Sequence, residues 1–444
     1  MLLVLLLLAS VGIIVYTTTR LSLHPFLALI VAALFFGLTS GMDPQLVIAS
    51  IEEGFGKVAG GVGIVIIAGI IIGTFLERSG GAANIAAWVL DRVGVRRVPL
   101  AMSLVGYITS IPVFGDSAFV MLQPLNQALT RRAGLSLATT VMALVLGLQV
   151  SHTMVPPTPG PIAAAEILGA DLGLVLAIGV PVSLVVVLIG CLYAIKWAGR
   201  VELNPAEGLI EADPEPHPDA PGPAKSFAPI FVPLILIVLR SVARFPTRPF
   251  GEGGISGFVE FIGHPIIALS LGVLLSFTLP KKFERKMLSA SGWVGKALYS
   301  GAVIILITGA GGAFGKVLQN SGIVDLIGGA MVGGSLGLWM PFLIAAALRT
   351  AQGSATVALI TTASLLAPLV GPLGLESSVG KAMMVLAIGA GSMVASHAND
   401  SMFWIVTQMS GMDVKTGYRL QTVLTTALGF TAAFLLWLVG LVLL

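Results

Sequence analysis

Nearly uncharged apolar stretches recur from one end of this 444-residue chain to the other, and most are close to the ~20 residues that an α-helix needs to cross a bilayer core. The stretches are continuous rather than alternating, which favours helices over the strands of a barrel. Only 10% of the residues are charged, against about 25% in soluble domains. The sequence therefore predicts an all-α polytopic membrane protein that is surrounded by the lipid bilayer.

Charge and cysteine content exclude several classes. The net charge of +3 is too small to suggest a nucleic-acid partner. The single cysteine, Cys191, allows neither an intrachain disulfide nor a zinc or iron–sulfur cluster, and we expect no metal and no cofactor. The N-terminus has no basic region and no small-residue cleavage site, so we interpret it as the first span rather than a removed signal peptide.

The apolar segments form two sets around a polar stretch. Residues 200–226 are rich in Pro, Glu and Asp, and we expect them to be a cytoplasmic linker. A first transmembrane repeat then covers residues 1–199 and a second covers residues 227–444. The apolar segments of the first set fall at about 2–18, 24–41, 58–77, 98–130, 137–170 and 174–198, and those of the second at about 227–243, 264–280, 299–320, 336–372, 379–411 and 420–443.

Short motifs recur in the same order in the two sets, which is typical of the internal repeats of transporters. The spacing between the motifs is nearly kept as well. The matches are residues 24–29 with 264–269, residues 73–80 (GTFLERSG) with 315–322 (GKVLQNSG), residues 117–120 with 354–357, and Ser151 and His152 with Ser396 and His397.

Two segments in each half are too long for one simple span and carry polar and small residues near their middle. We predict that residues 98–130 and 336–372 are re-entrant hairpins and that residues 137–170 and 379–411 are broken transmembrane helices. A chain unwinds inside a bilayer only where its free N–H and C=O groups face protein, a ligand or a water-filled cavity. The interruption QVSHTMVPPTPGP, residues 149–161, is therefore expected to form part of a substrate site.

Basic residues indicate which ends of a span face the cytoplasm. Arg96 and Arg97 precede the segment 98–130, and Arg131 and Arg132 follow it, so both of its ends are predicted to be cytoplasmic. Each half then has five crossings and one hairpin. An odd number of crossings predicts that the two halves are inverted relative to each other. Both chain termini are predicted to be external.

The same topology makes the second hairpin open outward. It also places Arg240, Arg244 and Arg248 on the external side, against the rule that basic residues gather inside. We keep this topology in spite of that exception.

New half-helices are predicted to begin after the interruptions. Thr158 suits an N-cap and Pro159 suits the first helical position. Four helix N-termini would then converge near the midplane, and their free N–H groups favour an anion such as a carboxylate. The other predicted start positions, which we also take as substrate contacts, are Ser117, Ser354, and the run Asn399, Asp400 and Ser401. Further hydroxyl and amide groups that could read a hydroxylated substrate are those of Ser151, Thr153, Thr158, Thr350, Gln352, Ser354, Thr356 and Asn399.

Ionisable residues near the interruptions are candidates for chemistry. Asp116 would be an intramembrane carboxylate, which is costly and points to function. The alternative is that it only caps the return arm of the first hairpin. His152 and His397 could each exchange a proton near neutral pH, or could only bond unwound backbone. Arg349 could pair with a substrate carboxylate, or could neutralise Asp116 or Asp400.

Several motifs are specific in combination, and together they resemble the gluconate permease family, the gluconate:proton symporters, within the ion transporter superfamily. These motifs are residues 114–116 with Pro124, His152 with residues 156–161, and residues 169–173, 349–356 and 391–404. The resemblance covers nearly the whole chain. It implies uptake of gluconate and related sugar acids, with members for glycerate and D-serine, driven by the proton gradient across a bacterial inner membrane. It also implies inverted repeats with two hairpins and two broken helices.

We therefore predict a secondary active symporter, not an enzyme, for a hydroxylated carboxylate. The half-helix starts would hold the carboxylate, and Asp116 with one or both of His152 and His397 would carry the coupling proton. The alternative within transport is a sodium-coupled carrier that uses Asn399, Asp400 and exposed carbonyls as ligands. A passive anion channel and an intramembrane hydrolase are the other classes, and the repeat argues against the hydrolase. A homodimer is a possible assembly.

Overall fold

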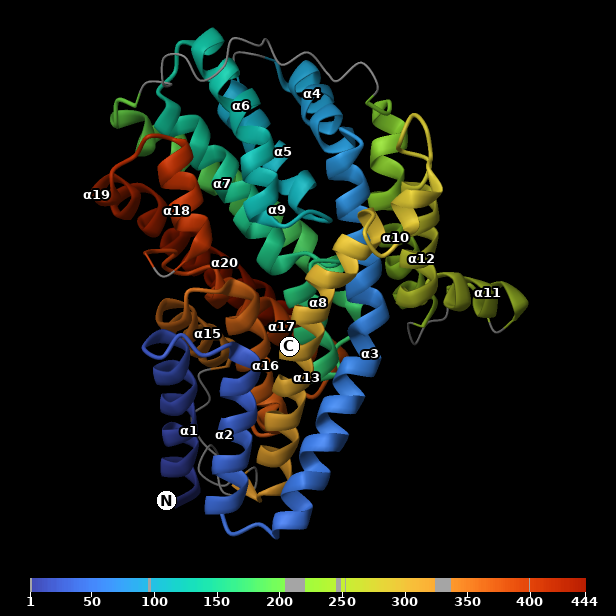
Figure 1. Cartoon of the computed structure of the whole chain (residues 1–444), viewed down its shortest axis with the longest axis vertical. Coiled ribbons are helices and arrows are strands. Elements are labelled where there is room, and N and C mark those ends of the chain that lie inside the picture. Colours follow the sequence, from blue (N-terminus) through green and yellow to red (C-terminus); the bar gives the residue numbers. More distant parts are fainter. Residues whose placement is uncertain are drawn as a thin grey trace.

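The computed structural model describes residues 2–94, 97–203, 220–244, 249–251, 253–323, 337–398 and 400–444. Arg96, Arg248, Asn399 and most of the predicted linker lie outside these residues. Within them every regular element is helical and no strand occurs, which confirms the predicted all-α class (Figure 1). Five of the described helices, or up to seven if each bent pair counts as one span, are long and apolar enough to cross a membrane.

The two halves of the chain present their helices in the same general order (Figure 1). The first half contains α1 (Leu2–Thr19), α2 (Pro25–Thr39), α3 (Pro44–Arg78), α4 (Gly81–Val93), α5 (Val98–Ser110), α6 (Gly115–Ala133), α7 (Leu137–Met154), α8 (Pro159–Leu168) and α9 (Leu172–Lys196). The second contains α10 (Pro223–Ala243), α11 (Gly254–Ile262), α12 (Pro265–Ser276), α13 (Trp293–Asn320), α15 (Trp339–Gln352), α16 (Ala355–Leu366), α17 (Ser378–Ser392), α18 (Ser401–Met409), α19 (Val414–Gly417) and α20 (Val423–Leu443).

Each of the four long apolar segments is divided into two helices where polar and small residues interrupt it. Residues 111–114 separate α5 from α6, residues 155–158 separate α7 from α8, and residues 393–400 separate α17 from α18. Gly353 and Ser354 separate α15 from α16, and Gly353 has φ 81°, a left-handed conformation that glycine adopts without strain. These four interruptions position the candidate site.

The second helix of each half begins in the same way. Pro25 and Pro265 occupy the first turn of α2 and α12, where the missing N–H of proline removes no hydrogen bond. The preceding histidines act as N-caps through Nδ1, His24 by accepting from the N–H of Phe26 (3.3 Å) and His264 from that of Ile266 (3.4 Å). The shared His-Pro motif thus has one local structural role in both halves.

Among the helices that the structure describes, α3 and α13 form the most extensive contact, and they run side by side (Figure 1). Asn320, at the end of α13, donates from Nδ2 to Oγ of Ser50 near the start of α3 (2.9 Å). Gly301, near the start of α13, lies against Ile67 in the second half of α3. The two helices are therefore antiparallel, which is the arrangement that an inverted repeat requires.

One contact between α3 and α13 joins residues that correspond in the repeat. The motif at residues 73–80 matches that at 315–322, a shift of 242 positions. The same shift relates Gly63 to Ile305, and the Ile305 side chain lies 3.6 Å from the position that a Cβ on Gly63 would take. A residue that contacts its own counterpart marks the place of a local twofold axis. The inverted relation of the complete halves remains a prediction.

Equivalent helices also pack at backbone distance in both halves. A Cβ on Gly147 of α7 would lie 2.0 Å from the carbonyl oxygen of Ser103 in α5. A Cβ on Gly391 of α17 would lie 2.2 Å from the carbonyl oxygen of Phe342 in α15. Glycine at these positions lets each broken helix pack directly against the first arm of its hairpin.

Several helices differ from the predicted apolar segments: α4 and α11 fall between these segments, and α3, α10 and α13 begin before theirs. α3 begins at Pro44, well before the apolar run, because Asp43 caps it and Glu53 forms an ion pair with Lys316 of α13 (2.9 Å) instead of ending the helix. α10 begins at Pro223, inside the predicted linker. Polar stretches that the sequence suggested to be loops are helical here, because an N-cap or a charged residue of a neighbouring helix pairs with their polar groups.

Candidate functional site

The starts of α6, α8, α16 and α18 meet and bring both halves of the chain into one polar cluster. Ser401 of α18 donates from Oγ to Oδ2 of Asp116 in α6 (2.7 Å). His152 of α7 lies with Nε2 3.4 Å from Oγ1 of Thr356 in α16. The ring of Phe114, just before α6, lies 6.4 Å from the imidazole of His152. The predicted convergence of half-helices is therefore present.

The two starts in the second half are capped by their own side chains. Ser354 accepts a hydrogen bond from the N–H of Val357 (3.3 Å) at the start of α16. Asp400 accepts one from the N–H of Met402 (3.2 Å) at the start of α18. Both residues are therefore N-caps, as the sequence pattern indicates.

The two starts in the first half are not capped in this way. Thr158 occupies the N-cap position of α8, but its hydroxyl donates to the carbonyl of Val155 (2.6 Å). Phe114 precedes α6 and its side chain offers no capping atom. Asp116 and Ser117 lie within the first turn of α6, so the alternative that Asp116 only caps this helix is wrong, and Ser117 does not begin it. The first N–H groups of α6 carry a partial positive charge without a side-chain acceptor at the N-cap. In α8 only the N–H of Gly160 does so, because Pro159 and Pro161 have no N–H.

Arg349 is the most deeply buried cation near the interruptions, with only 1% of its surface exposed. Its guanidinium donates to the carboxylate of Asp400 and to the carbonyl oxygen of Gly353. Of the three partners proposed for Arg349, the structure selects Asp400. This ion pair compensates the negative charge of Asp400 inside the protein.

Ser396 joins the second break by hydrogen bonds to α20 and to the residues that precede α20. Its hydroxyl donates to Asp400 and accepts from Nε2 of Gln421 (3.1 Å). Its N–H donates to Oγ1 of Thr425 (3.0 Å), and its carbonyl accepts from Oγ1 of Thr422 (2.6 Å). The unwound backbone at Ser396 is thus satisfied by the protein itself.

The first break and the hairpin tip opposite it contain buried polar atoms without a partner. Among the described residues these include Oγ of Ser151, Nδ1 of His152, and both amide atoms of Gln352. Nε of Arg349 is a further one. Buried polar groups in proteins are almost always hydrogen-bonded. These groups are therefore available to a polar ligand or to water.

The two predicted proton-carrying histidines differ in environment. His397 donates from Nε2 to the carbonyl of Thr350 (2.8 Å), and its ring stacks on Tyr418 with centroids 6.3 Å apart. His397 therefore bonds a carbonyl in the last turn of α15, and its role in proton transfer stays a prediction. His152 is held only loosely by Thr356 and keeps Nδ1 free.

Other predicted contacts have ordinary helical roles in this conformation. The hydroxyl of Thr153 donates to the carbonyl of Gln149 (3.0 Å), and that of Thr350 donates to the carbonyl of Ala346 (2.8 Å). Asn399 is outside the described residues. Among the predicted contacts, the structure thus pairs Asp116 with Ser401 and His152 with Thr356.

A small void lies beside His152, between the first hairpin tip and the start of α8. It has a volume of about 10 Å³, which admits a single water-sized group. Gly69 and Ile70 of α3 line it with Phe114 and Thr158, and no sequence pattern pointed to these two positions of α3. A sugar acid does not fit in this void, whereas the hydrogen bond between Ser401 and Asp116 lies in an exposed position.

The fold is shared with a solved transporter. The crystal structure of the Alcanivorax borkumensis YdaH transporter matches 95% of this chain and 99% of its own, with a TM-score of 0.65 and 14% sequence identity. Together with the apolar spans and the broken helices, this defines the fold as that of a polytopic membrane protein.

Sequence comparison defines the family. The chain belongs to the GntP family permeases, whose family model matches residues 1–442. It is 36% identical to the gluconate permease of Pseudomonas aeruginosa over 98% of this chain and 96% of that protein. It is 35% identical to the inner membrane permease YgbN of Escherichia coli strain K12 over 97% of both chains. The predicted resemblance is therefore confirmed, and the protein is a multi-pass inner-membrane transporter rather than an enzyme.

Proposed function

We propose that this permease imports a small hydroxylated organic acid, such as gluconate, together with a proton. The name of the Pseudomonas aeruginosa relative supports gluconate as the substrate. The uncapped starts of α6 and α8 support an anionic substrate, because helix N-termini stabilise negative charge. Ser151, Gln352 and Thr356 are the groups that would bind the hydroxyls.

The observation that carries the coupling proposal is the contrast between two carboxylates. Asp400 is neutralised by Arg349. Asp116 accepts a hydrogen bond from Ser401, and it forms no ion pair with any residue that the structure describes. Asp116 is thus the carboxylate of the cluster that is not paired directly with a cation among the described residues.

This carboxylate gives a physical reason for joint binding. A substrate carboxylate held at the start of α6 would bring a second negative charge close to Asp116. Two like charges ~4 Å apart repel by about 4 kcal/mol at an effective dielectric constant of ~20. A proton on Asp116 removes that repulsion, so substrate and proton would bind together. His152 would be a second proton carrier, since its Nδ1 has no partner among the described residues.

Sodium coupling is the second candidate, and Asp400 argues against it. The carboxylate of Asp400 already accepts from Arg349, Ser396 and the N–H of Met402. An oxygen already bound by a guanidinium is a poor ligand for another cation. Sodium remains an arm of the experiment because Asn399 lies outside the described residues.

Uptake into proteoliposomes tests the proposed function. Purified protein is reconstituted, and gluconate, glycerate and D-serine are each offered under an imposed pH gradient, with and without sodium. We expect gluconate to accumulate above its external concentration without sodium and to leave when a protonophore is added. Accumulation that follows only a sodium gradient, or flux without accumulation, would contradict proton symport. The homodimer stays a prediction, which the mass of the protein in detergent measures.

A further inference from the structure

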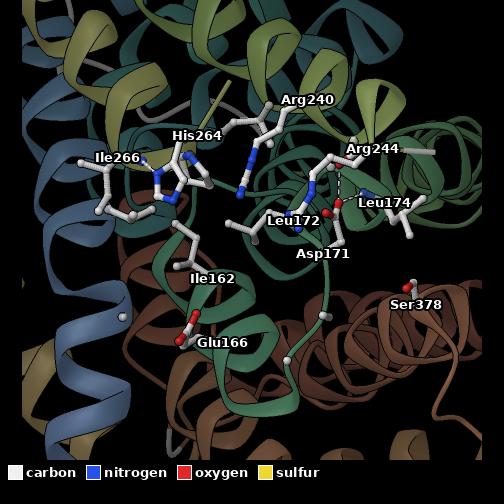
Figure 2. Close-up of a pocket in the computed structure, with 18 of the residues that line it drawn as sticks. Ile162, Glu166, Asp171, Leu172, Leu174, Arg240, Arg244, His264, Ile266 and Ser378 are labelled. Atoms are coloured by element: carbon white, nitrogen blue, oxygen red, sulfur yellow. Dashed lines mark hydrogen bonds between the residues drawn. The ribbon is translucent and has the colours of Figure 1, made fainter. Parts of the chain in front are cut away.

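A second and much larger cavity lies at the other end of α8. Its volume is about 900 Å³, enough for a sugar acid with its hydration water (Figure 2). It is bounded by the turn between α8 and α9, the end of α10, and the starts of α12 and α17, with the middle of α3 as one wall. The helix ends that surround it belong to the face that the predicted topology places outside.

Two arginines, one helical turn apart on α10, extend into this cavity (Figure 2). Arg244 has a distant ion-pair partner, since its Nε lies 4.0 Å from Oε2 of Glu260. Arg240 forms no hydrogen bond and no ion pair with any of the residues that the structure describes. Its guanidinium is therefore a cation that is open to a ligand.

The nearest acidic group in the cavity does not occupy Arg240. The carboxylate of Asp171 accepts from the N–H of Leu174 (2.9 Å) and from the hydroxyl of Ser241 (Figure 2). On the other side, His264 uses Nδ1 to accept from the N–H of Ile266. That bond places the ring proton on Nε2, which leaves a second donor at the cavity wall.

The contact between α3 and α8, here called the α3–α8 seam, runs from this cavity to the void beside His152. At one end of the seam the carboxylate of Glu166 lies against Gly61, and at the other the carbonyl of Pro157 lies 3.1 Å from the Cβ position of Gly69. Eight residues of helix span ~12 Å. On each side of the seam, the residues that line the two cavities are spaced four apart and so share one face of their helix. They are Gly61, Val65 and Gly69 on α3, and Thr158 at the N-cap of α8 with Ile162 and Glu166 within it.

We propose that this cavity is the outer vestibule of the transport path, where Arg240 binds the carboxylate of the arriving organic acid before it moves along the α3–α8 seam. The inference rests on the proposed function, because it takes the same acid as its ligand. It also gives a reason for arginines on the side where the positive-inside rule disfavours them. A cation at the mouth of a cleft raises the local concentration of an anionic substrate.

Transport kinetics of Arg240→Gln test the vestibule. Proteoliposomes made only of phosphatidylcholine are used, with Arg240→Lys as the conservative variant and Lys296→Gln, an exposed charge at the start of α13, as the control. We expect Arg240→Gln to raise the KM for gluconate about tenfold with little change in maximal rate. Arg240→Lys should recover most of the loss, Lys296→Gln should behave as wild type, and 1 M salt should shrink the difference because it screens charges beyond ~3 Å.

An unchanged KM in Arg240→Gln would overturn the vestibule while leaving gluconate uptake intact. An effect that occurs only when anionic phospholipid is added would also overturn it, because the ligand of Arg240 would then be a lipid headgroup. If wild-type protein accumulates none of the acids, the proposed function fails and the vestibule fails with it. The wild-type control therefore separates the two failures.

Thiol labelling gives a readout that does not depend on KM. The only cysteine of the chain, Cys191, is buried, so Arg240→Cys introduces the accessible thiol. In intact cells, a membrane-impermeant anionic thiosulfonate should label this thiol from outside, and gluconate should slow the labelling. Absence of labelling in intact cells, with labelling in inverted vesicles, would place the cavity on the other face and overturn an outer vestibule.

Discussion

The two breaks occupy equivalent places in the repeat but have opposite characters. At the second break, Arg349 compensates Asp400 and Ser396 is bonded on all of its polar groups. At the first break, the corresponding Ser151 has no hydrogen-bond partner among the described residues, and His152 keeps one ring nitrogen free. The protein thus closes the second break with its own charges and leaves polar groups of the first break available to a ligand.

This contrast also indicates which parts stay together. Separating a buried ion pair leaves two uncompensated charges in a low dielectric, which is costly. We therefore expect the tip of α15 and α16 to move as one body with the start of α18. The first break is joined to α16 by the long contact of His152 with Thr356, so this contact is the more easily broken of the two.

We expect the largest effect from removing the ion pair at the second break. Arg349→Met leaves Asp400 buried without its cation and should destabilise the protein by about 3–5 kcal/mol. The double variant with Asp400→Leu removes both charges and should recover much of that loss. Thermal unfolding in detergent measures both. If the single variant is as stable as wild type, the ion pair does not close the second break.

A second test concerns the close helix packing that the two halves share. Gly147→Ala and Gly391→Ala each force a methyl group onto a backbone carbonyl of the facing helix. Each should cost about 1–3 kcal/mol, and the two costs should be similar. Gly115→Ala is a matched control, since no atom lies within 4 Å of its Cβ position. A large difference between the first two variants would mean that the packing of the halves has diverged along with the breaks.

Substitution of the two histidines tests whether the two breaks differ in their contribution to uptake. His152→Gln should reduce gluconate uptake about tenfold, the effect of losing one hydrogen bond of ~1.5 kcal/mol to a charged ligand. His397→Gln should leave uptake nearly unchanged, because His397 bonds backbone. Initial rates at equal protein levels decide the matter. The comparison fails if His397→Gln is the more damaging substitution.

The serines give the smallest expected effect. Ser396→Ala removes an acceptor of Gln421 and a donor to Asp400, and should cost about 1–2 kcal/mol of stability. Ser151→Ala should leave stability unchanged, since its hydroxyl bonds nothing that the structure describes, and should raise the KM for a hydroxylated acid. Unfolding temperatures and KM values of the two variants are compared. Equal stability losses would show that Ser151 is also structural.

Local features of the breaks were predictable from the sequence because local chemistry determines them. Proline and glycine interrupt α7 and the hairpin tip at Gly353, and the caps at Ser354 and Asp400 follow from residue type and position. The prediction for the start of α6 was wrong. The residue type of Asp116 suggests an N-cap, but the helix begins at Gly115 and Phe114 occupies the N-cap position.

Features that depend on distant parts of the chain were not predictable. Arg349 had three possible partners, and only the fold brings it to Asp400. The cavity around Arg240 arises from the ends of helices that are far apart in sequence. The hydrophobic pattern of the sequence carries no information on this ion pair or on this cavity.

The central claim, that Asp116 takes up the coupling proton, is tested most directly by measuring proton uptake when substrate binds. Purified protein in weakly buffered solution with a pH indicator receives gluconate, and wild type is compared with Asp116→Asn. Asparagine keeps the shape of a protonated aspartic acid, so the variant should still bind gluconate. The account predicts proton uptake by wild type and a smaller uptake by Asp116→Asn, because the variant lacks the proton that Asp116 carries. Equal proton uptake by both proteins would contradict it and assign the proton to another group.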